Sequence, residues 1–185
     1  MGEESHPLLD AHILIVDDDA AIRESMDEFI GMAGFRSSTA ASAEDALDIL
    51  DHDYFDVVIT DIMLPGMDGL ELTDRIKKKH EIDVIVMTGY SGDYSYEEAI
   101  SKGASDFVFK PVRFEELLLR LKRVLKERRL TQERTQMLEK LKRLSITDGL
   151  TKLYNSRYFY NQLKIEIDRT ERYQRPLSLL LLDID

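Results

Sequence analysis

The sequence contains no cysteine, which excludes a disulfide framework and any chemistry at a thiolate. No apolar run approaches the roughly 20 residues that a membrane-spanning helix requires. The acidic N-terminus also lacks the basic and apolar regions of a signal peptide. The four histidines are scattered along the chain, which argues against a metal site built from imidazoles (His6, His12, His52 and His80). We therefore expect a cytoplasmic protein.

Positive charge is scarce in the first part of the chain. Residues 1–112 hold 8 Lys and Arg against 25 Asp and Glu, whereas residues 113–185 hold 17 against 11. This asymmetry indicates two functional units, and the first would repel the phosphates of a nucleic acid. The basic excess lies between Arg113 and Arg143 and lacks the aromatic interleaving of a nucleic-acid site, and we interpret it as a charged helix face. We expect no nucleic-acid partner and no membrane partner.

Short apolar runs alternate with amphipathic stretches through the first 112 residues. The apolar runs have the length of buried strands, and the stretches between them have helical spacing. This alternation predicts an α/β fold, a doubly wound five-stranded parallel sheet with the flavodoxin-like order 2-1-3-4-5. The predicted strands are 12–16, 35–39, 57–60, 83–87 and 107–109, and the predicted helices are 20–33, 42–51, 69–79 and 95–102.

Neither glycine nor proline occurs between residues 113 and 148, where apolar residues recur at helical spacing. We predict one long helix over 113–146, with a break in its register at the charged stretch 126–129. Such a helix either packs along its own domain and frays, or forms a stalk that pairs with another helix. The apolar residues resume after the break, which favours the stalk.

The chain after this helix has the pattern of a second, partial α+β domain. We predict a structured turn over 145–155, an amphipathic helix over 155–173 and an apolar strand over 177–182. A buried strand cannot satisfy its backbone or cover its faces alone. We therefore expect the chain to end inside a second domain.

Chemically reactive side chains follow four of the five predicted strands of the first part, at Asp17-Asp18, Asp61, Thr88 and Lys110. In a parallel sheet these strand ends share one edge. Three carboxylates placed together require a cation, and an all-oxygen ligand set indicates Mg²⁺ or Mn²⁺. The hydroxyl and the amine complete a site suited to phosphoryl transfer onto a carboxylate.

Each of these residues also has an ordinary structural interpretation. An aspartate among residues 17–19 can cap a helix, Asp61 can cap a turn, and Lys110 can be a surface charge. Thr88 can be a turn residue. Their coincidence at four strand ends favours the joint site.

Together these residues resemble the receiver domain of two-component response regulators, the CheY-like family, over about residues 10–125. The match comprises Asp17-Asp18, Asp61 with the loop up to Gly69, Thr88, and Lys110-Pro111. The resemblance implies that a histidine kinase or phosphotransfer protein phosphorylates Asp61. It also implies direct Mg²⁺ ligands (Asp18 and Asp61), a ligand acting through water (Asp17), a backbone carbonyl ligand (Met63) and contacts to the phosphoryl oxygens (Thr88 and Lys110).

Two positions depart from the common pattern of that family. Phe107 occupies the switch position where tyrosine is common. Phenylalanine lacks the hydroxyl that the hydrogen-bonded form of the switch uses, and a switch through side-chain packing remains. Gly89 follows Thr88 where alanine is frequent, which leaves the site open.

The C-terminal part resembles the start of a GGDEF domain, the diguanylate cyclase family. Residues 148–157 are similar to its opening motif, and residues 179–185 are similar to the strand that leads to its metal site. The resemblance implies that Asp183 and the carbonyl of Ile184 are metal ligands. The GGDEF signature and the rest of the nucleotide site are absent, so we expect a truncated domain that cannot complete its active site.

We divide the chain into an N-terminal tail (1–10), a receiver (11–125), a helical linker that overlaps the last receiver helix (113–146) and a partial GGDEF domain (147–185). We expect the chain to catalyse no reaction other than its own phosphorylation. Through the linker it would control a diguanylate cyclase-type output of the intact parent. A homodimer, through the receiver face or the linker, would bring two outputs together.

Three other functions remain open. The chain could be a stand-alone receiver that serves as a phosphorelay intermediate or phosphate sink. It could be a protein-binding module that is never phosphorylated. A Mg²⁺-dependent phosphohydrolase of similar topology is disfavoured, because such enzymes typically need a second carboxylate where this chain has Met63.

Overall fold

The computed structural model describes residues 10–89, 100–180 and 182. Nearly all of the predicted tail 1–10, most of the predicted helix 95–102, Asp183 and Ile184 lie outside these residues. The chain divides into two compact units, Met1–Leu130 and Thr131–Asp185.

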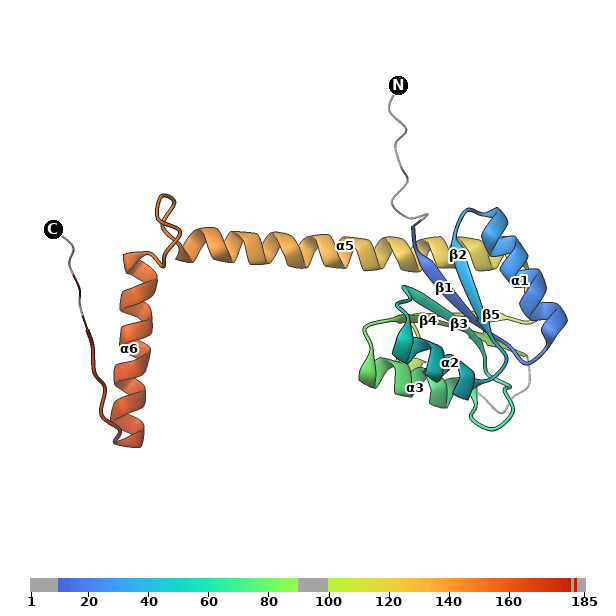
Figure 1. Cartoon of the computed structure of the whole chain (residues 1–185), viewed down its shortest axis with the longest axis horizontal. Helices are drawn as coiled ribbons and strands as arrows, with labels where there is room; N and C mark the ends of the chain where they lie inside the picture. Colours follow the sequence, from blue (N-terminus) through green and yellow to red (C-terminus); the bar gives the residue numbers. More distant parts are fainter. Residues whose placement is uncertain (1–9, 90–99, 181, 183–185) are drawn as a thin grey trace, which may run out of the picture. The chain divides into compact units, whose positions relative to one another are not determined.

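The first unit is built on a five-stranded parallel sheet with the order β2-β1-β3-β4-β5 (Figure 1). Its strands are β1 (His12–Val16), β2 (Arg36–Ala40), β3 (Val57–Asp61), β4 (Asp83–Thr88) and β5 (Asp106–Phe109). The predicted fold class and strand order are confirmed, and each predicted strand end lies within one residue of the observed one. This order brings the C-terminal ends of β1 and β3 side by side.

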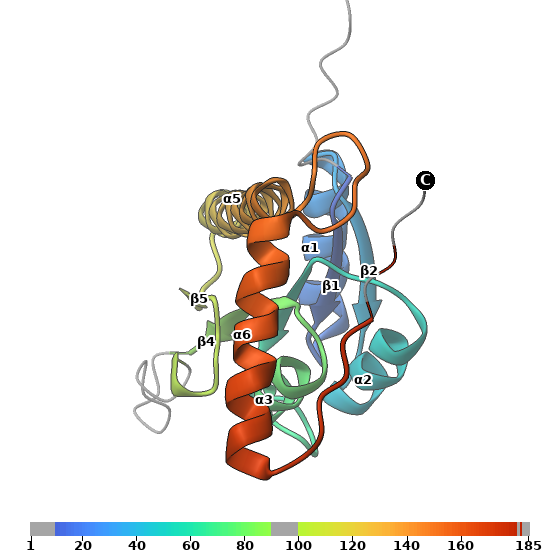
Figure 2. The same cartoon turned by 90° about the vertical axis from the view of Figure 1, so that its left-hand side faces the viewer.

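Helices cover both faces of this sheet, as Figures 1 and 2 show from two directions. α1 (Ala20–Met32) and the first part of α5 (Phe114–Ile146) lie on one face, and α2 (Ala43–His52) and α3 (Gly69–Lys79) lie on the other. In β1, Ile13 and Ile15 pack into the cluster under α1 and α5, while Leu14 and Val16 pack into the cluster under α2 and α3. Burial on both faces explains why the central strands are continuous apolar runs.

Side-chain caps fix the starts of three helices. Asp19, Ser42 and Asp68 accept hydrogen bonds from backbone N–H groups in the first turns of α1, α2 and α3. Caps of this kind typically contribute about 1 kcal/mol each. They also determine where the loops between strands and helices end, and these loops carry the residues of the sheet edge.

Burial along α5 is confined to its first part. Leu117, Leu121, Val124 and Leu125 are buried, whereas Leu130, Met137, Leu141 and Leu144 are exposed. The predicted long helix is confirmed, since α5 continues unbroken to Ile146. Within the described residues, no helix has both the length and the apolar composition needed to cross a lipid bilayer.

The second unit contains the end of α5, a turn and α6 (Ser156–Tyr173). An antiparallel bridge between Thr147 and Tyr154 closes the turn, and Asn155 caps α6. The prediction of a strand over 177–182 is wrong for its described part, because residues 177–180 and 182 form no strand. A strand needs a partner for its backbone hydrogen bonds, and the described part of this unit offers none.

Candidate functional site

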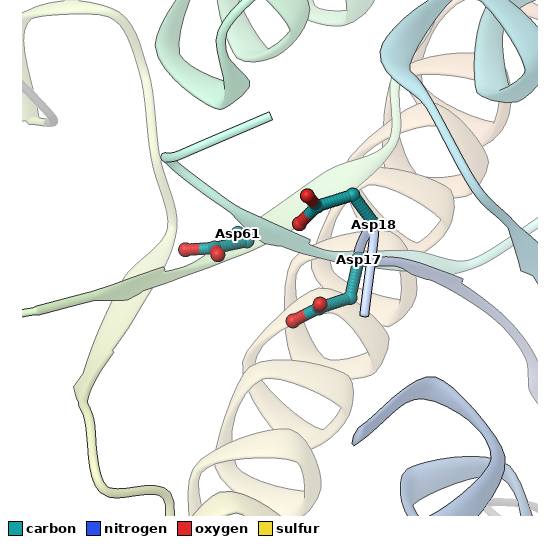
Figure 3. Close-up of side chains that lie close together, drawn as sticks. All are labelled: Asp17, Asp18 and Asp61. Carbon is teal, nitrogen blue, oxygen red and sulfur yellow. The ribbon is translucent and has the colours of Figure 1, made fainter. Parts of the chain in front are cut away.

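Three carboxylates converge at the C-terminal edge of the sheet. Asp17 and Asp18 follow the last residue of β1, and Asp61 is the last residue of β3. One oxygen from each lies within 4.8 Å of the other two (Figure 3). Asp17 and Asp61 are buried, while Asp18 is exposed. The structure therefore brings together the acidic residues that the sequence placed at one sheet edge.

In the loop after β1, one aspartate caps α1 and the two before it belong to the site. Asp19 is the N-cap of α1, and its Oδ1 accepts hydrogen bonds from the N–H groups of Ala21 and Ile22. The Asp17 N–H donates to the carbonyl of Ala40, and Asp17 Oδ1 accepts a hydrogen bond of 2.9 Å from the Asp19 N–H. Because Asp19 is the cap, Asp17 and Asp18 are left to face Asp61.

The backbone at Asp61 is packed tightly against the start of α3. The Gly69 N–H donates to the carbonyl of Ile62 at 2.9 Å. A Cβ atom added to Gly69 would lie 1.9 Å from the carbonyl oxygen of Asp61, so this approach requires glycine. Asp68 caps α3, and the Asp61 side chain is therefore not needed as a cap.

Lys110, the first residue after β5, supplies a positive charge to this cluster. Its Nζ donates to Asp61 Oδ2 at 2.6 Å and to Asp17 Oδ2 at 3.3 Å. Burial alone would lower the pKa of Lys110, but the hydrogen bond to Asp61 and the charges of both carboxylates outweigh burial and raise it. At Asp17, burial raises the pKa of the carboxyl, and the hydrogen bond from Asp19 and the charge of Lys110 offset this only partly.

One oxygen of Asp61 has no hydrogen-bond partner among the residues that the structure describes. Oδ1 is buried and accepts no hydrogen bond from the described residues, although a buried polar oxygen is costly when unpaired. Carboxylate oxygens close together are the ligands that a hard divalent cation prefers, and Mg²⁺ needs only one or two of them directly. The donor set of Asp17, Asp18 and Asp61 therefore fits Mg²⁺ or Mn²⁺.

The remaining predicted site residues lie at the end of β4, on β5 and in the loop after β3. Thr88 ends β4 at the same sheet edge, and its hydroxyl donates to the carbonyl of Gly89 at 3.0 Å. Met63 lies in the loop between β3 and α3 with an exposed side chain. Phe107 is half-buried on β5, and the centroid of its ring lies 5.2 Å from the centroid of the Phe109 ring. The roles of all three residues stay predictions.

Two polar residues near the site had not been expected from the sequence. Nη1 of Arg23, in α1, donates to the carbonyl of Asp17 at 2.6 Å. Oε1 of Glu44, in α2, accepts a hydrogen bond of 3.3 Å from the N–H of Met67 in the loop after β3. The only signal for Arg23 is its spacing, which places it one helical turn after Asp19. Glu44 had no such signal, because its partner lies 23 residues away.

Two family models match the chain. The model described as "Response regulator receiver domain" matches residues 13–122. The model described as "Diguanylate cyclase, GGDEF domain" matches residues 145–185. The first range contains every residue of the carboxylate cluster together with Lys110. The second begins at the end of α5 and includes the turn and α6.

Curated relatives share mainly the first unit. The transcriptional regulatory protein AfsQ1 of Streptomyces coelicolor is 36% identical over 114 residues, which is 62% of this chain and 51% of that protein. A cyclic di-GMP phosphodiesterase of Thermotoga maritima is 35% identical over 132 residues, which is 71% of this chain and 35% of that protein. The chain thus spans about half, or less, of the length of these relatives.

Solved structures of receiver domains are similar in fold and sequence. A CheY-like response regulator receiver domain protein of Methanospirillum hungatei has a TM-score of 0.61 and 32% identity, covering 66% of this chain and 98% of that chain. NtrX of Brucella abortus, in complex with ADP, has a TM-score of 0.65 and 31% identity, covering 86% of this chain and 34% of that chain.

Proposed function

The chain belongs to the family of response regulator receiver domains, and on that premise we propose that Asp61 accepts a phosphoryl group in a Mg²⁺-dependent reaction. The observation that carries the proposal is the convergence of Asp17, Asp18 and Asp61, of which Asp17 and Asp61 accept hydrogen bonds from the Lys110 ammonium. The unpaired buried oxygen of Asp61 adds support, since it is available to a cation or a phosphorus atom. The phosphoryl donor would be a histidine kinase or a phosphotransfer protein.

In the proposed reaction, a carboxylate oxygen of Asp61 attacks the phosphorus atom of a phosphorylated histidine. The O–P bond forms as the N–P bond breaks, and the imidazole nitrogen keeps the bonding electron pair and takes up a proton from solvent. A bound Mg²⁺, held by Asp18, Asp61 and the Met63 carbonyl with Asp17 assisting through water, would neutralise the charge of the carboxylates and phosphoryl oxygens.

Lys110 and Thr88 are the proposed contacts to the phosphoryl oxygens. The Lys110 ammonium already touches Asp61 and needs only a small movement to reach a group attached to it. The Thr88 hydroxyl is engaged with the Gly89 carbonyl, and rotation about its χ1 angle would free it to donate to a phosphoryl oxygen. We propose that this rotation is coupled to the packing of Phe107 on the adjacent strand β5.

An output of the diguanylate cyclase type is proposed for the intact parent. The match of residues 145–185 to the GGDEF domain supports it. The proposed division is a receiver over 11–125, a linker over 113–146 and a partial GGDEF domain over 147–185. The chain itself would carry the input switch and no complete cyclase site.

A homodimer through α5 is proposed as the link between input and output. Leu130, Met137, Leu141 and Leu144 are exposed, at spacings of seven, four and three residues. Such spacing places apolar side chains along one stripe, which is the pattern that pairs helices in coiled coils. We call these four residues the α5 seam. Pairing of two seams would hold two output domains near one another.

Phosphorylation is tested by incubating the full chain with acetyl phosphate and Mg²⁺ and measuring its intact mass. Wild type should gain the mass of one phosphoryl group, and Asp61→Asn should gain none. Asp68→Asn is the matched control, because Asn is an equally good cap for α3 and should leave phosphorylation unchanged. A wild type that gains no mass with Mg²⁺ would favour a binding module that is never phosphorylated.

A further inference from the structure

Arg23 reaches from the first turns of α1 back to the end of β1. Its Nη1 donates a hydrogen bond of 2.6 Å to the carbonyl oxygen of Asp17, and the side chain is only partly exposed. A hydrogen bond from a guanidinium to a carbonyl is charge-assisted, and such bonds are about twice as strong as neutral ones. This contact is therefore a strong constraint on the loop after β1.

The carbonyl that Arg23 holds belongs to the peptide group that joins Asp17 to Asp18. The Asp17 side of this group is held in three further ways, through the Asp17 N–H, through Oδ1 and through Oδ2. The Asp18 carboxylate, by contrast, makes no hydrogen bond or ion pair with the described part of the chain, and it is exposed. Its direction is set by the backbone on either side of it.

We infer that Arg23 is a positioning residue for the metal, because it fixes the peptide plane that aims Asp18 at Asp61. Its effect passes through the backbone, and Arg23 itself touches neither carboxylate. The inference rests on the proposed function, since it assigns Arg23 a role in Mg²⁺ binding. Residues that orient metal ligands typically change metal affinity by 10- to 100-fold when they are removed.

A purely electrostatic role would have the opposite effect. A guanidinium beside a cation site repels the cation, so its removal would tighten Mg²⁺ binding. A purely structural role would lower stability and leave Mg²⁺ affinity unchanged. The sign of the change in the dissociation constant for Mg²⁺ therefore separates the three roles.

The experiment titrates the full chain with Mg²⁺ by isothermal calorimetry, for wild type, Arg23→Ala and Arg23→Lys. Positioning predicts that Arg23→Ala raises the Mg²⁺ dissociation constant about 10-fold. Arg23→Lys, which keeps a charged donor, should recover most of the affinity. Arg75→Ala, an exposed arginine on α3 paired with Glu71, is the control and should match wild type.

Unfolding in urea without metal, measured in parallel, shows whether each variant is folded, so that a change in Mg²⁺ affinity is not mistaken for a loss of folding. If Arg23→Ala is folded and binds Mg²⁺ as tightly as wild type or more tightly, the positioning role is wrong. If Arg23→Ala does not fold, Arg23→Lys and Arg23→Gln decide the question. Wild-type Mg²⁺ affinity in the uncharged Gln variant supports a role of the donated hydrogen bond alone. A wild type that binds no Mg²⁺ overturns the proposed function instead, and this inference with it.

Discussion

The Nζ atom of Lys110 lies 2.6 Å from Oδ2 of Asp61 and joins the ends of β5 and β3 across the intervening β4. The same atom lies 3.3 Å from Oδ2 of Asp17. One ammonium thus balances two buried carboxylates at the edge of the sheet. In the proposed function, this ion cluster is the resting form of a site that Mg²⁺ and a phosphoryl group would rearrange.

Replacing Lys110 with alanine leaves Asp17 and Asp61 without their shared counter-charge. We expect the metal-free variant to lose about 3 kcal/mol of unfolding free energy, because a buried carboxylate without its partner is strongly destabilising. Mg²⁺ should restore part of this loss, since it supplies positive charge at the same place. Urea denaturation with EDTA and with Mg²⁺ measures both effects. Lys126→Ala, an exposed lysine of α5, is the control, and equal midpoints for the two variants would contradict the account.

Replacing Asp17 with asparagine should stabilise the metal-free protein at neutral pH. Burial holds the pKa of the Asp17 carboxyl above its ordinary value of 3.8, so its ionisation costs more in the folded state than in the unfolded state. Protonated Asp17 therefore favours folding below that ordinary value, and this contribution is lost as the pH rises through the raised pKa. The asparagine variant has no such loss.

The gain of Asp17→Asn in unfolding free energy should consequently be larger at neutral pH than at a pH well below 3.8. Thermal or urea unfolding at the two pH values, in EDTA, measures this difference. Asp19→Asn, which keeps the cap of α1, should change stability by less than about 0.5 kcal/mol. A loss of stability in Asp17→Asn at neutral pH would show that ion pairing, and not burial, dominates at this residue.

Replacing Gly69 with alanine should disturb Asp61 directly. The added Cβ would lie 1.9 Å from the Asp61 carbonyl oxygen, so the backbone at the end of β3 or the start of α3 must move. We expect a loss of about 3 kcal/mol in unfolding free energy, together with slower phosphorylation by acetyl phosphate.

Gly31→Ala makes the same chemical change where nothing lies within 4 Å. It should raise the unfolding free energy by about 0.5 to 1 kcal/mol, because alanine favours a helix over glycine. Unfolding curves for both variants test the pair together. Similar effects of the two substitutions would contradict the close approach at Gly69.

Disrupting the α5 seam should weaken association of the chain. Leu144→Asp places a charge in the proposed helix pair, and we expect the dimer dissociation constant to rise by at least about tenfold. Sedimentation equilibrium over a range of concentrations measures this constant. Leu150→Asp changes a leucine of the turn that is 92% exposed and should leave it unaltered. A monomer mass for wild type at every concentration, with and without a phosphate mimic, would rule out the seam as an interface.

The strands and the main site residues could be predicted because the signal for each lies in a short, continuous stretch of sequence. The run Val57–Thr60 is β-branched and nearly all apolar, as a strand buried on both faces requires, and it ends on Asp61. Since all parallel strands end at one edge, Asp17 and Asp61 had to be neighbours once the strand order was chosen, and Lys110 had to lie at the same edge. The fold thus converts sequence positions at strand ends into a cluster.

Side-chain partners were not predictable in this way, because they depend on contacts between distant segments. Arg128 of α5 lies 3.2 Å from Asp83 at the start of β4 and 3.2 Å from the hydroxyl of Tyr54, partners 45 and 74 residues away. The engagement of the Thr88 hydroxyl with Gly89 likewise depends on a rotamer that no pattern specifies. The described residues of the apolar stretch 177–182 show the converse, since a preference for strand without a partner strand produced no strand there.

The most direct test of the account is to locate the phosphoryl group. The full chain is phosphorylated with acetyl phosphate and Mg²⁺, treated with borohydride, which reduces an aspartyl phosphate to homoserine, and mapped by peptide mass spectrometry. If Asp61 is the phosphoryl acceptor, homoserine appears at position 61 alone, and none appears when Mg²⁺ is replaced by EDTA. Homoserine at Asp17, at Asp18 or at a distant aspartate, or none at any position, would contradict the assignment of Asp61 as the phosphoryl acceptor.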